Sequence, residues 1–337
     1  MATLPLLRGK SISLEDALAD DDNVLHRLDY PQKHKDFWSY LVSIKVDIEA
    51  TVAFHLSAEY CQADDEANWM FGSYSVCIPV WVNPPSVNRI LIRIPLPHKI
   101  GEATNPGNVD EKLRCEAATY IWIRQNCPSV PIPLLHGFAF PDGQTFVEPS
   151  SAPLLTRICW RVNHTVRSWL GLPTSCPYIS LGRRGAWKTG YMIISFVERG
   201  RMLSDSWAVM LQDTARRQTL FSDLAKIILS LSRVRLPRAG SLTMSNEGVI
   251  SLTNRPLTLR LQTLENEGIP TIPRDSTYES VEPYLLDLLQ CHDNRIYYQP
   301  NAIHDVKDGQ EQLAALTMMR VGFRISSSLV STAMVPF

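Results

Sequence analysis

Two neighbouring stretches, WMFGSYSVCIPVWV at 69–82 and NRILIRIPL at 88–96, are the clearest strand signals in the chain. Both are rich in β-branched and aromatic residues that alternate along the sequence, which is typical of strands with one buried face. A Pro-Pro-Ser turn at 84–86 separates them, and Gly72 interrupts the first stretch. The pattern predicts two or three antiparallel strands in this region.

A helix and an extended connector follow these strands. The segment EKLRCEAATYIWIRQNC at 111–127 has an apolar helical face, and Asp110 is positioned to cap it. In PSVPIPLLHGFAF at 128–140, prolines at near-alternate positions exclude a helix. A further strand is predicted at TGYMIISFV, residues 189–197.

The rest of the chain differs in composition and in the spacing of its apolar residues. Residues 1–30 are polar and acidic and predict a loose arm, whereas residues 37–56 repeat apolar residues at helical spacing. Residues 149–187 show no clear period and are interpreted as an insertion. From Leu203 onward the pattern is helical.

Within the C-terminal part, Asn-Glu-Gly at 246–248 predicts a short hairpin. Helices are expected at 220–234, 278–293 and 307–320. The final residues, 321–337, are serine-rich and aperiodic.

This order of strands, one helix, an extended connector and then helices predicts an α+β protein in two lobes. The expected units are an N-terminal arm and helix at 1–55, a sheet lobe at 56–198 with an insertion at about 149–187, a partial helical lobe at 199–320 and an atypical tail at 321–337.

The composition is that of an ordinary globular protein: 337 residues, 45% hydrophobic and 20% charged, with a net charge of −1. Such a balance provides no strong field, so we expect neither nucleic acid nor a membrane as a partner. Seven dispersed cysteines predict reduced thiols. Because no signal peptide or spanning segment is evident, the cytoplasm is the expected location.

The order of elements resembles the aminoglycoside phosphotransferase/choline kinase-like family, particularly its fungal branch. The resemblance covers roughly residues 55–320 and rests on five segments: FGSYSVC (71–77), ILIRIPLP (90–97), RCEAATYIWIRQNCPSVPIPLLHGF (114–138), GYMIISFVERGRMLSDSW (190–207) and SLTNRPLT (251–258). It implies a bilobal protein kinase-like fold, with an antiparallel sheet and one helix in the N-lobe and an incomplete, mostly helical C-lobe. The implied activity is ATP-dependent phosphoryl transfer to a small-molecule hydroxyl.

Gly72 and Ser73 lie between two predicted strands, where a glycine lets the backbone approach a phosphate and a hydroxyl can donate to it. An ordinary hairpin turn is the alternative interpretation. The resemblance implies that this segment is the loop that covers the phosphates, with Ser73 as its side-chain contact.

Arg93 is a cation inside an otherwise apolar strand, and a charge there is costly unless it is paired. Glu116 follows on the next predicted helix. In kinase-like folds a strand cation holds the α- and β-phosphates and is itself held by a helix carboxylate. The family often has lysine at this position, and arginine keeps the charge with a different geometry. The alternative is an edge-strand arginine that faces water.

Ser195, Phe196 and Val197 follow a buried strand and resemble the hinge between kinase lobes, whose backbone groups would bind the edge of adenine. Together with Gly72, Ser73, Arg93 and Glu116, which are described above, they form the predicted ATP site.

The catalytic loop of the family, H-x-D-x-x-x-x-N followed by a second Asp, is not found. His34-Lys35-Asp36 has Leu41 where the asparagine is required, and His292-Asp293-Asn294 and His304-Asp305 lack the spacing. No catalytic residue and no Mg²⁺ site can therefore be assigned. We expect the chain to depart from the family at about Val321, through truncation, alternative splicing or an intron read as coding.

Three functions remain open. The chain could be an active small-molecule kinase, although the sequence names no acceptor and lacks the catalytic loop. It could be a non-catalytic module that binds a nucleotide or a protein. It could also be a fragment that self-associates through exposed helix faces of the C-lobe. The missing catalytic loop favours an inactive protein.

Overall fold

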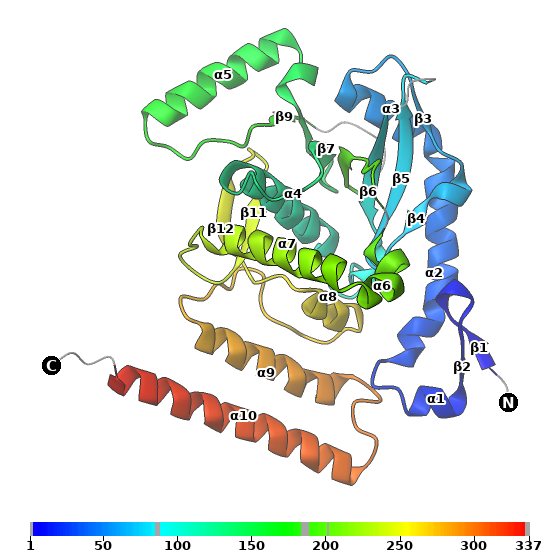
Figure 1. Cartoon of the computed structure of the whole chain (residues 1–337), viewed down its shortest axis with the longest axis vertical. Coiled ribbons are helices and arrows are strands. Elements are labelled where there is room, and N and C mark those ends of the chain that lie inside the picture. The colour runs from blue at the N-terminus through cyan, green and yellow to red at the C-terminus, as the bar shows by residue number, and fades with distance from the viewer. Residues whose placement is uncertain (1–2, 85–87, 183–188, 201, 334–337) are drawn as a thin grey trace.

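The structure, a computed structural model, describes residues 3–84, 88–182, 189–200 and 202–333, with side chains placed as far as Phe323. It is an α+β protein built on one large antiparallel sheet with helices on both faces (Figure 1). This confirms the predicted α+β class. None of the helices in these ranges combines the length and apolar character needed to cross a lipid bilayer.

The main sheet has the strand order β3-β5-β6-β10-β7-β8-β9, and β4 pairs with β5 beside β3. The strands are β3 (Cys61–Ala63), β4 (Met70–Phe71), β5 (Ser75–Val82), β6 (Arg89–Pro95), β7 (Leu135–Ala139), β8 (Thr145–Val147), β9 (Ile179–Leu181) and β10 (Tyr191–Ser195). The strands expected at 69–82, 88–96 and 189–197 are therefore present. The turn residues 85–87 lie outside the described residues.

The alternation in β5 and β6 buries one face of the sheet. Val76, Ile78 and Val80 of β5 and Ile92 and Ile94 of β6 are fully buried in one core. The helices α2 (Val24–Ser43) and α3 (Lys45–Leu56) cover this face. They include the predicted helical segment 37–56, and the first begins earlier than expected.

The opposite face carries α4 (Asn108–Asn126), whose Leu113 packs near Met192 of β10. A hairpin of β11 (Ser241–Met244) and β12 (Ile250–Asn254), predicted around 246–248, joins the same core through Met244. Residues on both sides of the expected boundary at 198/199 thus share one core. The division into two lobes stays a prediction.

The start of α4 differs from the prediction. Asp110 does not cap this helix, because the helix begins three residues earlier than predicted, with Gly107 at the N-cap position and a φ of 94°. The Glu102 carboxylate accepts the N–H groups of Gly107 and Val109 at 2.9 and 2.7 Å. Asp110 lies in the first turn and pairs with Arg114 at 2.6 Å.

The N-terminal residues do not form the loose arm that their polarity predicts. They form the strands β1 (Thr3–Pro5) and β2 (Ser11–Ser13) and the helix α1 (Leu14–Leu18). Gln299 and Asn301 hydrogen-bond backbone oxygens between Asp20 and Asp22. These partners lie far away in sequence, so a local pattern could not reveal them.

The segment 149–187 is not structureless in its described part. It contains the helix α5 (Leu154–Trp169), and its strand β9 pairs with β8 at the edge of the main sheet. Residues 183–188 of the expected insertion lie outside the described residues.

The C-terminal part is mostly helical, as predicted. Its helices are α6 (Leu203–Gln212), α7 (Thr214–Ser232), α8 (Leu259–Asn266), α9 (Val281–Tyr298) and α10 (Val306–Ala333). The 3₁₀ turns of the chain are η1 (Leu7–Gly9), η2 (Glu66–Asn68), η3 (Pro97–Lys99) and η4 (Pro149–Ser151). The prediction of an aperiodic tail was wrong as far as Ala333, because α10 continues through it, and residues 334–337 lie outside the described residues.

Candidate functional site

The predicted ion pair between β6 and α4 is present. Arg93 Nη1 lies 3.2 Å from Glu116 Oε2, and its Nη2 lies 3.3 Å from Oε1. Lys112, one helical turn before Glu116, places its Nζ 2.6 Å from Oε1. Glu116 therefore holds two cations. The Arg93 and Glu116 side chains are 27% and 22% exposed, so the pair is accessible from one side.

The strand register explains why this pair forms. Arg93 lies between Cys77 of β5 and Met192 of β10 on the sheet face that α4 covers. Burial raises the pKa of the Cys77 thiol, with nearby Arg93 opposing the shift. The Arg93 charge thus lies in a partly dehydrated environment, where a paired carboxylate is needed.

The predicted phosphate loop lies at a different place. Gly72 and Ser73 line a pocket of about 550 Å³ between the N-terminal hairpin, α2 and α8. A Cβ on Gly72 would lie 3.1 Å from the backbone oxygen of Ser75, so the turn is tight. Ser73 makes no hydrogen bond within the described residues, so its hydroxyl and N–H are free to donate.

This glycine-loop pocket has an excess of positive charge. Four cations and two carboxylates line it: Arg8, Lys10, Arg27, Lys99, Asp22 and Glu267. Burial, with Arg27 and Arg8 nearby, lowers the pKa of Lys99 to about 8, and the Lys99 ammonium lies 3.3 Å from the centroid of the Tyr30 ring. Such a pocket favours an anionic ligand.

Tyr74 stands between the glycine-loop pocket and the ion pair. Its hydroxyl lies 3.2 Å from Thr263 Oγ1, and Lys112 Nζ lies 5.9 Å from the centroid of its ring. Neither Arg93 nor Glu116 lines the pocket. The structure therefore places the predicted loop and the predicted pair on the two sides of Tyr74, and not in one cavity.

The predicted hinge, Ser195 to Val197, begins at the last residue of β10, near the start of β6 and away from the Arg93–Glu116 pair. The Ser195 N–H already donates to the Leu134 oxygen at 2.9 Å, and its hydroxyl lies 2.9 Å from His136 Nε2. The N–H of Phe196 faces Arg89 of β6 in the continuation of the β6–β10 ladder, whereas the backbone groups of Val197 make no hydrogen bond within the described residues. Of the three predicted hinge residues, Val197 is thus the one whose backbone is free to bind a ligand.

One face of Phe196 is covered by a cation. The Arg89 guanidinium lies 4.1 Å from the centroid of the Phe196 ring and 4.8 Å from that of Trp81. It also makes a bidentate contact with Glu198, at 3.3 and 2.7 Å. This exposed cluster fixes the start of the segment that leads to α6.

The β6 register relates the hinge to the ion pair. Ser195 pairs with Ile90, and Arg93 lies three residues further along the strand. At roughly 3.3 Å per residue, the hinge and the Arg93 guanidinium are separated by about 10 Å along one strand. The half-buried Leu91 lies between them on the same face.

Sequence reasoning missed a buried ionic cluster beside this site. Arg255, only 1% exposed, contacts Glu111 of α4 through Nη2 at 2.7 Å and Glu265 of α8 through Nη2 at 3.0 Å. Arg274 reaches the same Glu111 oxygen at 3.1 Å. Burial alone would lower the pKa of Arg255, but hydrogen bonds to Glu111 and Glu265 raise it above its ordinary value.

The cluster positions α4, the helix that carries Glu116. Arg255 lies in SLTNRPLT (251–258), a segment that contributes to the family resemblance, but no role was predicted for it. A charged residue between a predicted strand and a proline was the only signal. Its two carboxylate partners, Glu111 and Glu265, lie on separate helices.

Comparisons with known proteins add no assignment: no family model, no curated protein and no solved structure matches the chain. Across the described ranges, no three His, Cys, Asp or Glu side chains gather in a way that could hold a metal ion. The predicted ATP site therefore stands on the geometry above alone.

Proposed function

We propose that the chain is a kinase-like protein that binds ATP without transferring its terminal phosphate. The observation that carries this proposal is the ion pair between Arg93 on β6 and Glu116 on α4. In protein kinases a cation on the third strand holds the α- and β-phosphates and pairs with a glutamate on the following helix. Here β6 is likewise the third strand of the antiparallel run β4-β5-β6, and α4 follows it.

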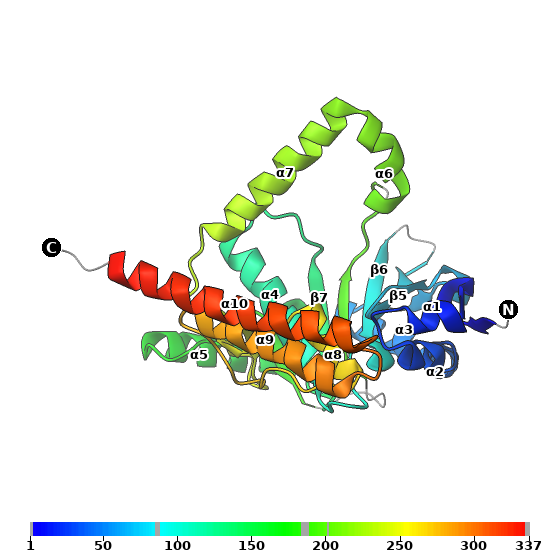
Figure 2. The same ribbon diagram turned by 90° about the horizontal axis from the view of Figure 1, so that it is seen from below.

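The proposed fold is bilobal, with an incomplete helical second lobe over 199–320. The helices α6 and α7 begin directly after the hinge segment and project away from the sheet as an arch (Figure 2). Several large apolar side chains on them are exposed, among them Trp207 and Phe221. Helix faces of this kind support the idea that further chain or a partner normally packs there.

The residues present fit a nucleotide in part. The backbone groups of Val197 would meet the edge of adenine, and Leu91 would contact its ring. The Arg93 guanidinium, about 10 Å along β6 from the hinge, would meet the phosphates. The residues do not fit Mg²⁺, because no three His, Cys, Asp or Glu side chains of the described ranges gather where a metal ion could bind, and Glu116 serves as the partner of Arg93 and Lys112.

The positions of two of the histidine–aspartate motifs, His34-Lys35-Asp36 and His292-Asp293-Asn294, support the absence of phosphoryl transfer. His34 in α2 packs 4.3 Å from the Phe71 ring centroid, and Asp36 accepts a hydrogen bond from Gln32 at 2.7 Å. Asp293 in α9 pairs with Arg320. Asp36 lies on α2, which covers the sheet face opposite to α4, and Asp293 is held by Arg320, so neither is placed beside Arg93 and Glu116 to position an acceptor hydroxyl, as phosphoryl transfer requires.

A thermal-unfolding titration combined with a turnover assay tests this proposal. ATP should raise the melting temperature, because a ligand at 100 times its Kd adds about 2.7 kcal/mol of stability. Arg93→Ala should lose the shift, whereas Lys226→Ala, at an exposed pair on α7, should keep it. Magnesium-dependent ATP turnover that is abolished by Glu116→Ala would overturn the inactive assignment.

A second candidate is a protein-binding or self-associating fragment. The exposed apolar side chains of α6 and α7 favour it, and it requires no nucleotide. A folded protein that shows no ATP response but associates through α7 would support this alternative.

A further inference from the structure

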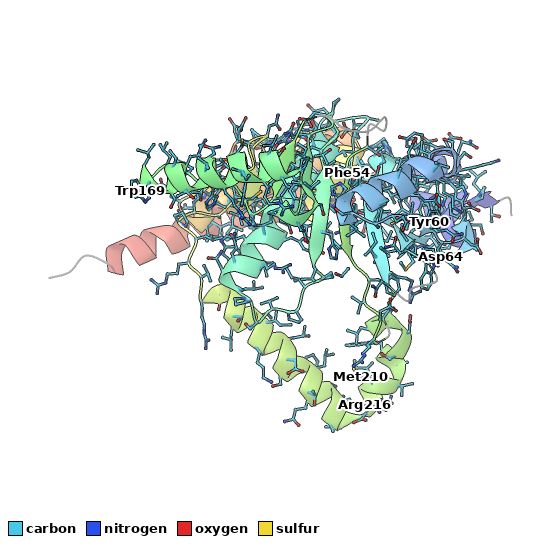
Figure 3. All side chains as sticks on the ribbon, turned by 90° about the horizontal axis from the view of Figure 1, so that it is seen from above. Phe54, Tyr60, Asp64, Trp169, Met210 and Arg216 are labelled. Carbon is cyan, nitrogen blue, oxygen red and sulfur yellow. The ribbon has the colours of Figure 1, made fainter. Side chains whose placement is uncertain are left out.

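The helix α5 presents its apolar side to solvent. Seven large apolar residues recur at helical spacing along it and just beyond its end, and all are exposed: Leu154, Leu155, Ile158, Val162, Val166, Trp169 and Leu170. Leu155 is 79% exposed and Trp169 is 91% exposed. Figure 3 shows Trp169 at the outer end of the helix, away from the body of the molecule.

The residues of α5 that face the protein are half-buried and mostly polar: Thr156, Arg157, Trp160, His164 and Arg167. Arg157 donates to the backbone oxygens of Ser150 and Ala152 at 3.1 and 3.3 Å, and Arg167 Nε donates to that of Pro173 at 2.9 Å. Trp160 packs against the small core that includes residues of β8 and β9. These contacts fix the helix with its apolar side outward, the reverse of an ordinary surface helix.

The charged side chains of α5 and its flanking segments, apart from the histidine, are all positive. Between Pro149 and Gly182 the chain contains three arginines and no aspartate or glutamate, although acids and bases balance over the whole sequence. The third arginine, Arg161, is exposed, and its side chain makes no hydrogen bond or ion pair within the described residues. Glu247, which interacts electrostatically with Arg167, is an acid from outside this segment, but α5 itself presents only positive charge to an anionic surface.

We propose that α5 is an amphipathic anchor that binds the surface of an anionic phospholipid membrane. A helix of 16 residues is about 24 Å long and can lie in the interface with its apolar side roughly 5–10 Å deep. At that depth the arginines on its other side reach the level of the headgroups. Trp169 has the ring type that is enriched at this boundary.

The charge pattern distinguishes α5 from α7, a second helix with exposed apolar residues, and disfavours a second copy of the chain as its partner. On α7 the exposed apolar residues are interspersed with both Asp223 and Lys226. Two α5 helices that packed together would bring only arginines to their rims. One helix face is also small compared with the roughly 800 Å² per partner of a stable interface.

Co-sedimentation of the full chain with vesicles tests the proposal. The protein should bind vesicles of phosphatidylcholine mixed with phosphatidylserine, bind phosphatidylcholine alone much less, and lose affinity as salt rises. Val162→Asp should weaken binding at least tenfold, and Arg161→Gln about fivefold. Ile228→Asp, the matched change on α7, should leave binding unchanged.

Fluorescence quenching tests whether α5 itself contacts the lipid. Brominated phospholipid should quench the tryptophan fluorescence of the wild type more than that of Trp169→Phe. A folded protein that ignores anionic vesicles would overturn the proposal, as would vesicle binding that survives Val162→Asp. Loss of a dimer in Val162→Asp, without vesicle binding by the wild type, would assign α5 to a protein interface instead.

Discussion

At the scale of single residues, Lys99, which lines the glycine-loop pocket, should make the stability of the protein depend on pH. Its folded-state pKa of about 8 lies below the ordinary value of 10.5, because the buried ammonium has Arg27 and Arg8 nearby. Between these two values the unfolded chain holds a proton that the folded chain has released. The contribution of Lys99 to stability should therefore rise with pH across this window.

Urea unfolding at a series of pH values, for the wild type and for Lys99→Met, measures this contribution. The wild type should gain stability relative to the variant as pH rises from about 8 toward 10.5. Parallel curves for the two proteins would contradict the placement of Lys99 in a dehydrated cationic pocket.

Gly137 in β7 is required by close packing. A Cβ at this position would lie 2.1 Å from Nδ1 of His55, a fully buried side chain of α3 whose Nε2 contacts the Tyr191 hydroxyl at 2.9 Å. Gly137→Ala should therefore cost more than about 2 kcal/mol of unfolding free energy. Gly322→Ala, where no atom lies within 4 Å, is the control and should be neutral or slightly stabilising. Equal stability of both variants would refute the contact.

At the scale of elements, the buried Arg255 joins α4, β12 and α8. Arg255→Met would leave the Glu111 and Glu265 carboxylates buried with less compensation, which typically costs 3–5 kcal/mol. Chemical denaturation should show this loss, whereas Arg216→Met, at an exposed pair, should change little. A loss below about 1 kcal/mol would mean that the cluster does not hold these elements together.

The elements that sequence reasoning predicted are those with strong local signals. The alternation of apolar residues predicted β5 and β6. Because an unpaired cation inside a strand is costly, Arg93 was expected to have a carboxylate partner, and Glu116 was the candidate. The N-terminal hairpin depends on distant partners such as Gln299, which no local pattern contains. The same is true of the Arg255 cluster. The apolar period of α5 is present in the sequence, and the interpretation of 149–187 as a segment without a clear period was wrong for this helix.

At the scale of the whole molecule, α6 and α7 project from the body (Figures 2 and 3), and large apolar side chains on both helices are exposed. We expect concentration-dependent self-association through α7, measured by light scattering after gel filtration. The double variant Phe221→Ser/Ile228→Ser should shift the protein toward the monomer, whereas Val162→Asp on α5 should not. A wild type that stays monomeric at high concentration would refute this expectation.

The central claim, ATP binding without phosphoryl transfer, is tested most directly by calorimetric titration of ATP into the full chain. The claim predicts saturable binding at one site, with affinity lost in Arg93→Ala and reduced in Glu116→Gln. It also predicts that ATP is recovered intact after the titration. A folded wild type that gives no binding heat at any temperature, or affinity that is unchanged in Arg93→Ala, would contradict it.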